Sequence, residues 1–187
     1  MKRYSLIQIS LHWLIALLIF AAFGLIWYYG DMQITSPATF KAKAAGIAWH
    51  KWAGMSVLIL FLLRLVVRVK QGSPAPLAGQ PKLQLLLAAG AHHLLYLLMA
   101  IVPLMGWLMS SAKGYPVKLF NLVQLPDLVA KSDTLAEQLE GAHVFLAYTL
   151  LVIVGLHAAA ALKHHFIDRD ATLLRMLPGG NKGENQA

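Results

Sequence analysis

The chain has 187 residues, of which 58% are hydrophobic and 13% are charged. This composition excludes an ordinary water-soluble domain, and because the apolar residues come in long runs, we expect the bilayer to surround most of the protein. The net charge of +8 would suit a nucleic-acid binder, but the basic residues flank apolar runs instead of forming one face, so nucleic acid is excluded as a partner. The lack of cysteine excludes disulfides, iron–sulfur clusters and thiolate-bound or covalently attached haem.

Four apolar runs reach the length of about 20 residues that a helix needs to cross a bilayer. They are predicted at about residues 6–29, 46–69, 83–109 and 140–166. The first run follows a short basic start, as in a signal peptide, but it is too long for one and lacks a small-residue cleavage site, so we predict a retained span. Pro103 and Gly106 are expected to bend the third run. The predicted fold class is all-α, a bundle of four transmembrane helices.

The segments between the spans are expected to be loops, with one short amphipathic helix near residues 126–139. Residues 71–82 are rich in proline and glycine, which favours an extended connection. We predict one domain over residues 1–178 and a mobile polar tail over residues 179–187. Lysine and arginine are more frequent on the side of the N-terminus, and loops rich in these residues usually face the cytoplasm. Both termini are therefore predicted to be cytoplasmic.

The fourth run carries two histidines in its apolar part, His143 and His157, fourteen positions apart. At about 100° and 1.5 Å per residue, both imidazoles leave nearly one face of the helix, at levels roughly 21 Å apart. Because successive spans alternate in direction, His50 falls at the level of His143, and His12 falls at the level of His157. Each pair joins two helices at one depth, as bis-histidine haem b requires. Ionisable groups inside a span usually mark a function, so we predict two haem b groups, one near each membrane surface.

Small residues lie one turn after two of these histidines, Gly54 after His50 and Ala16 after His12. They would leave room for a porphyrin to lie against the helix. Small residues also serve plain helix packing in membranes, and that interpretation stays open for both positions.

Arg64 and Arg68, at the end of the second span, either neutralise haem propionates or extend to lipid phosphates. His164 lies seven positions after His157, so it points along nearly the same stripe. A protonatable side chain there would bond a quinone carbonyl and relay protons to it. The alternative for His164 and His165 is a basic end of the helix at the membrane surface.

A pathway for zinc or copper ions is an alternative from a different class of protein. Such a pathway favours clustered ligands that include carboxylates or thiolates. The predicted spans carry no acidic residue near mid-membrane, and the chain has no cysteine. A haem protein is therefore favoured over a histidine-lined metal-ion transporter.

Five segments together resemble the bacterial cytochrome b561 family, the group that includes superoxide oxidase. They cover nearly the whole chain and read QISLHWLIALLI, AWHKWAGMSVLILFLLRLVVR, PAP…QPK, AHHLLYLLMAIVPLMGW and GAHVFLAYTLLVIVGLHAAAALKHHFIDRD. The resemblance implies a four-helix bundle in the bacterial inner membrane with two b haems. Its axial ligand positions match His12, His50, His143 and His157.

The resemblance also implies an activity, the oxidation of superoxide to dioxygen on the periplasmic side with reduction of ubiquinone. His164 matches a position associated with quinone, and Ser10 and Lys82 are further candidates for that pocket. A second interpretation keeps the haem but makes the chain the membrane anchor of a partner dehydrogenase or hydrogenase, passing electrons to the quinone pool.

Three lysines near the periplasmic haem fit the first interpretation, because superoxide is a small anion. Lys41, Lys43 and Lys51 precede or follow His50 closely in the sequence. We expect them to raise the local concentration of superoxide by electrostatic steering, an effect that salt weakens.

Overall fold

The computed structural model describes residues 3–77 and 79–178, and the tail predicted for residues 179–187 lies outside this part. Within the described residues, four long α-helices are joined by connecting segments, and the segment between α3 and α4 carries two short strands. The elements are α1 (Leu6–Tyr29), α2 (Pro37–Gln71), α3 (Lys82–Ala112), β1 (Lys118–Leu119), β2 (Val123–Gln124), α4 (Asp133–Phe166) and the 3₁₀ turn η1 (Leu174–Met176). All four α-helices are long and apolar enough to cross a membrane. The predicted fold class is confirmed.

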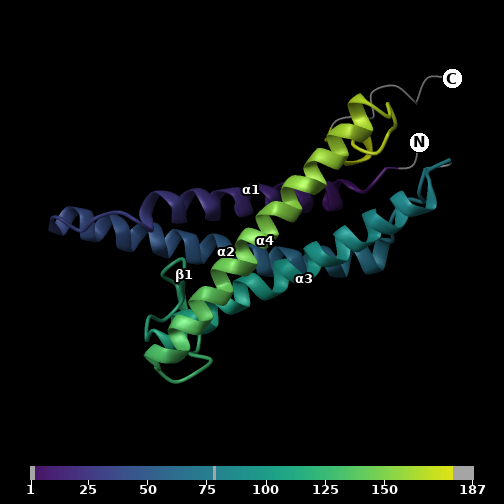
Figure 1. Cartoon of the computed structure of the whole chain (residues 1–187). Coiled ribbons are helices and arrows are strands. Elements are labelled where there is room, and N and C mark those ends of the chain that lie inside the picture. Colours follow the sequence, from purple (N-terminus) through teal and green to yellow (C-terminus); the bar gives the residue numbers. More distant parts are fainter. Residues whose placement is uncertain (1–2, 78, 179–187) are drawn as a thin grey trace.

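The four helices run alternately up and down the bundle (Figure 1). The start of α1 and the end of α4 lie at one end, which we call the terminal end, and the β1–β2 hairpin lies at the other, the hairpin end. Backbones pack closely between α1 and α2, between α3 and α4, and between α2 and α3. Side chains join α1 to α4, where the Trp27 Nε1–H donates to the Tyr148 hydroxyl at 3.2 Å.

The second helix begins at Pro37, nine residues before the predicted start of the span. Ser36 and Thr39 form a capping box there, with Thr39 N–H donating to Ser36 Oγ at 3.2 Å and Ser36 N–H donating to Thr39 Oγ1 at 2.9 Å. Proline suits the first helical position because its missing N–H would have no partner there. Hydropathy marks only the part of a helix that lies in lipid, so it missed these polar first turns.

The separate amphipathic helix predicted near residues 126–139 is wrong. Residues 133–139 are the first turns of α4, whose N-cap Ser132 accepts a hydrogen bond from Leu135 N–H at 3.4 Å. Residues 126–132 contain no helix. The amphipathic pattern was real, but it belonged to the exposed start of a longer helix.

A small hairpin, which the sequence analysis did not predict, closes the hairpin end. Its turn places Phe120 and Asn121 at φ values of 50° and 59°, and Leu122 N–H donates to Leu119 O at 2.8 Å. These are the backbone angles of a type I′ turn, which matches the twist of paired strands. The Trp52 Nε1–H donates to Lys118 O at 2.5 Å and so ties the hairpin to α2.

An apolar core fills the middle of the bundle and draws residues from all four helices. Its buried members include Ile19, Leu58, Leu98 and Leu150. Leu150 lies seven residues from both His143 and His157, so this layer sits between the levels of the two histidines. Helix α3 passes through Pro103 without interruption.

Gly46 is a point of close approach between α1 and α2. A Cβ atom at this position would lie 2.1 Å from Tyr29 Cγ, well inside van der Waals contact. We expect Gly46→Ala to destabilise the bundle by about 1–3 kcal/mol because the Tyr29 ring must move out of its packed position. The measurement is the midpoint of thermal unfolding in detergent, followed by circular dichroism. Gly24→Ala is the control, since no atom lies within 4 Å of a Cβ there; an equal loss in both variants would contradict the prediction.

Candidate functional site

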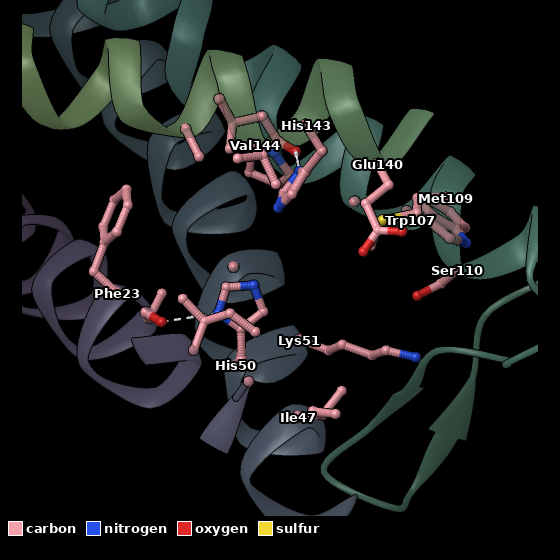
Figure 2. A pocket seen from close by; sticks show the side chains of 18 of the residues that line it. Phe23, Ile47, His50, Lys51, Trp107, Met109, Ser110, Glu140, His143 and Val144 are labelled. Carbon is pink, nitrogen blue, oxygen red and sulfur yellow. Dashed lines mark hydrogen bonds between the residues drawn. The ribbon is translucent and has the colours of Figure 1, made fainter. Parts of the chain in front are cut away.

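Two histidines face each other at the hairpin end, His50 from α2 and His143 from α4 (Figure 2). Their ring centroids are 6.3 Å apart and their planes are almost perpendicular, at 88°. The His50 Nδ1–H donates to Ala22 O at 2.8 Å, and the His143 Nδ1–H donates to Val102 O at 3.1 Å. Because a carbonyl can only accept, both rings keep the Nε2 lone pair free. A second partner that fixes the tautomer in this way is typical of metal-ligating histidines.

A cavity of about 560 Å³ surrounds this pair, within the size range of cofactor pockets. Apolar side chains from all four helices form most of its lining. Lys51, Ser110 and Glu140 lie together on one side of the two imidazoles (Figure 2). Lys113 also lines the cavity, and its ammonium is 2.8 Å from a Glu140 carboxylate oxygen.

Two glycines give this cavity its shape. No atom lies within 4 Å of a Cβ at Gly54, so the helix face one turn after His50 is open. A Cβ at Gly106 would lie 3.1 Å from His143 Cε1. Gly106 therefore makes room for the His143 imidazole, a role that the sequence analysis missed because it considered Gly106 only as a bend.

A second pair of histidines lies at the terminal end, His12 from α1 and His157 from α4. Their ring centroids are 6.1 Å apart, with an interplanar angle of 68°. His92 of α3, to which the sequence analysis gave no role, has its ring centroid 5.3 Å from that of His157. His93, its neighbour, is exposed and bonds to Ala89 O of its own helix at 2.7 Å. The two pairs expected from helix levels are thus the pairs that the fold brings together.

The two arginines predicted to contact propionates lie in the last two turns of α2, toward the terminal end of the bundle. Arg64 is only 8% exposed, and its Nη1–H donates to Gln8 O at 2.6 Å. The Arg68 guanidinium lies 5.9 Å from the centroid of the Tyr96 ring. A buried arginine inside a span needs compensation, so Arg64 marks a place where an anionic group would be stabilised.

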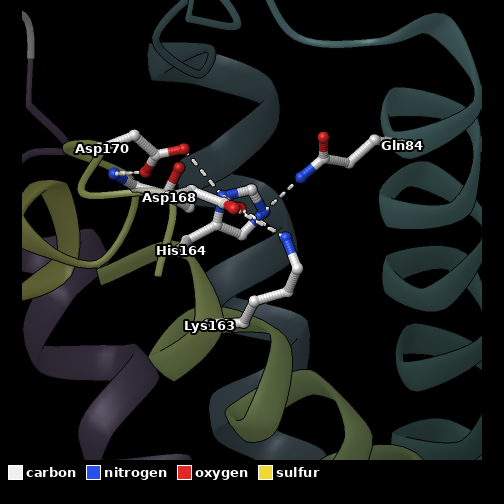
Figure 3. A network of polar contacts seen from close by, with 6 residues as sticks. Gln84, Lys163, His164, Asp168 and Asp170 are labelled. Carbon is white, nitrogen blue, oxygen red and sulfur yellow. Dashed lines mark hydrogen bonds and ion pairs between the residues drawn. The ribbon is translucent and has the colours of Figure 1, made fainter. Parts of the chain in front are cut away.

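His164, the predicted quinone residue, lies in a polar network at the terminal end (Figure 3). Its Nδ1 is 2.7 Å from an Asp170 carboxylate oxygen and 3.3 Å from one of Asp168. Its Nε2 is 2.9 Å from Gln84 Nε2 of α3. The sequence analysis missed all three partners, because helical spacing cannot show how the chain folds back after α4 ends.

The other two predicted quinone residues, Ser10 and Lys82, are not among the hydrogen-bond partners of His164. Ser10 and Lys82 are both exposed, and Gln84, two residues after Lys82, is the α3 side chain that reaches His164. Of the lysines expected to attract an anion, Lys51 lines the cavity, whereas Lys41 and Lys43 lie on the first turns of α2.

Comparison with known proteins decides the family. A model of prokaryotic cytochrome b561 matches residues 3–179. The chain belongs to the prokaryotic cytochrome b561 family. Cytochrome b561 homolog 2 of Escherichia coli (strain K12) is 32% identical over 182 residues, covering 94% of this chain and 92% of the relative. The probable superoxide oxidase CybB of Yersinia pestis is 32% identical over 178 residues, covering 95% and 97%. Cytochrome b562 of Cereibacter sphaeroides is 29% identical, covering 93% and 94%.

Membership in the cytochrome b561 family makes the chain a multi-pass bacterial membrane protein that holds haem b and transfers electrons. The residues present fit that group. Two imidazoles on opposite sides of one metal, each about 2 Å from it, have centroids roughly 6 Å apart, as both histidine pairs do. The family also favours electron transfer over the metal-ion transport considered from the sequence.

Proposed function

We propose that this cytochrome b561-family chain binds two haem b groups, oxidises superoxide to dioxygen at the hairpin end and reduces ubiquinone at the terminal end. In the balanced reaction, two superoxide anions, one ubiquinone and two protons give two dioxygen molecules and one ubiquinol. The observation that carries the proposal is the facing pair of His50 and His143 across a cavity with two lysines in its lining. The probable superoxide oxidase among its relatives supports the choice of donor.

Each histidine pair has a separate task in this proposal. His50 and His143 hold one haem, and their bonds to Ala22 O and Val102 O fix both rings with Nε2 toward the cavity. His12 and His157 hold the other. Haem b would supply reversible one-electron transfer when bound, and each histidine pair would hold one group.

The remaining residues neutralise charge and deliver protons. Arg64 and Arg68 balance the haem propionates at the terminal end. His164 faces the quinone and supplies it with protons, with Ser10 and Lys82 as further members of that pocket. The excess of lysine and arginine on the terminal side supports a cytoplasmic terminal end in the bacterial inner membrane and a periplasmic hairpin end.

The test begins with a reduced-minus-oxidised spectrum and the haem-to-protein ratio of the purified chain. Stopped-flow mixing with superoxide, with and without ubiquinone, then measures haem reduction and quinol formation. We expect two haems per chain, rapid reduction by superoxide and quinol formation from it. Haem that superoxide fails to reduce would contradict the proposal and favour the partner-anchored interpretation, in which a dehydrogenase or hydrogenase supplies the electrons.

Lys51 is expected to attract superoxide to the hairpin-end cavity. Its ammonium donates to Tyr115 O at 3.3 Å, which holds the charge at the cavity lining. We expect Lys51→Gln to lower the second-order rate of haem reduction by superoxide about threefold at low salt, and the difference to vanish at high salt. Lys41→Gln is the control, because Lys41 is exposed and does not line this cavity. An equal effect of both changes at low salt would show that only the overall charge matters.

A further inference from the structure

His164 lies between Asp170 and Gln84, and each of these side chains contacts a different ring nitrogen (Figure 3). On one side, the His164 Nδ1–H donates to the Asp170 carboxylate at 2.7 Å. On the other, Gln84 Nε2 lies 2.9 Å from His164 Nε2. The amide N–H donates to a neutral ring, and after a half-turn of the amide its oxygen accepts from a protonated one. The site can therefore hold His164 with one or two protons without losing a hydrogen bond.

Asp170 is the negative charge that acts on the ring. Partial burial raises the pKa of its carboxyl, but hydrogen bonds from Thr172 and His164 together hold that pKa below its ordinary value. The carboxylate thus stays ionised at neutral pH and stabilises an imidazolium. Asp168 also lies 3.3 Å from Nδ1, but the Lys163 ammonium is 2.7 Å from its carboxylate and compensates it. From α3, the neutral Gln84 contacts the other ring nitrogen.

The segment after α4 is fastened so that Asp170 stays in place. Thr172 N–H donates to Asp170 Oδ1 at 2.8 Å, which orients the carboxylate. Further along, Trp13 Nε1–H of α1 donates to Met176 O at 2.7 Å, and Arg175 Nη1–H donates to Ala75 O, in the loop before α3, at 2.7 Å. The segment is therefore bonded both to α1 and to the α2–α3 connection.

A metal ion is a less suitable occupant of this cluster. The donor atoms of His164, Asp168 and Asp170 lie within 4.8 Å of one another, as in a metal site. However, Lys163 already supplies a positive charge to both oxygens of Asp168, at 2.8 and 2.7 Å. The cluster is better described as the ion pair of Lys163 and Asp168 beside a histidine that is hydrogen-bonded to Asp170.

From this geometry we propose that Asp170 and Gln84 are positioning residues that make His164 the proton donor to the reduced quinone, an inference that rests on the proposed function. The quinone oxygen takes the place of the Gln84 amide at His164 Nε2 and accepts the proton there, while the Nδ1–H keeps its hydrogen bond to Asp170. The neutral ring then accepts a hydrogen bond from the Gln84 amide at Nε2, until Nε2 is protonated again by water at the terminal end. Two such cycles supply the two protons that accompany the two electrons from superoxide.

The test compares Asp170→Asn, Gln84→Leu and, as the control, the double variant Lys163→Gln/Asp168→Asn in the purified, haem-loaded full chain. The control removes the neighbouring ion pair and so leaves the net charge around His164 unchanged. For Asp170→Asn we expect quinol formation to slow about tenfold or more. We also expect the pH above which quinol formation declines to be lower in this variant, because the ring loses the carboxylate that is hydrogen-bonded to its Nδ1–H. Gln84→Leu should slow quinol formation in the same way, from a different helix. Haem reduction by superoxide without quinone should be unchanged in both, and the double variant Lys163→Gln/Asp168→Asn should leave the pH profile in place.

A readout independent of turnover is ¹⁵N NMR of ring-labelled histidine. In the wild-type chain the His164 signal should report the Nδ1–H tautomer, and Asp170→Asn should increase the Nε2–H fraction, whereas Asp170→Glu should restore the wild-type signal. An unchanged tautomer and pH profile in Asp170→Asn would overturn the inference, as would an equal shift in the double variant Lys163→Gln/Asp168→Asn. If the wild-type chain forms no quinol, the proposed function fails, and with it the donor role of His164; the tautomer then decides whether Asp170 orients the ring.

Discussion

His143→Ala is expected to remove one of the two haem groups and abolish oxidation of superoxide. His143 and His50 come from different helices, so loss of either imidazole leaves a single ligand at the hairpin-end cavity. The pair of His12 and His157 lies at the other end of the bundle, beyond the apolar core, and should stay partly loaded. The measurement is the haem-to-protein ratio with the visible spectrum, followed by stopped-flow mixing with superoxide. His50→Ala should give the same result.

The control for this prediction is His93→Ala. His93 is exposed and its ring bonds to Ala89 O of its own helix, so its loss should change neither haem content nor the reaction with superoxide. Retention of both haems in His143→Ala would remove His143 from the ligand set. Loss of both haems in a chain that still shows helical circular dichroism would show that the two pairs do not load independently.

Gly54→Leu is expected to abolish haem binding at the hairpin end while leaving the helix at least as stable. The space in front of Gly54 is open and belongs to the cavity beside His50. A leucine there would occupy the space that a porphyrin needs, whereas in the helix itself leucine is favoured over glycine by roughly 0.5–1 kcal/mol. The measurement is haem content, together with the thermal unfolding midpoint of the haem-free protein.

The matched control is Gly24→Leu, at an exposed position of α1 with no atom within 4 Å. It does not line the cavity, so its haem content should match the wild type. Full haem content in Gly54→Leu would show that the porphyrin lies elsewhere, and would leave Gly54 with a role in helix packing only.

The transmembrane part of the fold could be predicted from the sequence because lipid imposes a simple condition. A span must be apolar over its whole length, so hydropathy located all four helices, and α1 was predicted with its observed ends. The level of each histidine then followed from the alternation of spans. This alternation was enough to predict that His12 pairs with His157 and that His50 pairs with His143.

Outside the lipid, the same reasoning failed because other interactions decide the structure. The start of α2 depends on the capping box of Ser36, and the hairpin depends on a turn through Phe120 and Asn121. Asp170 reaches His164 only because the chain turns back after α4. Neither apolar periodicity nor helical spacing contains information about such contacts.

The apolar layer around Leu58, Leu98 and Leu150 has a bioenergetic consequence. An electron can tunnel across such an apolar layer, but these residues offer no polar groups along which a proton could pass. If electrons enter from the periplasm and protons from the cytoplasm, each turnover moves negative charge inward without a compensating ion. Moving one electron across the full membrane changes its free energy by about 2.3 kcal/mol for every 100 mV of membrane potential. Removal of a toxic radical would then also help to set the voltage across the cell envelope.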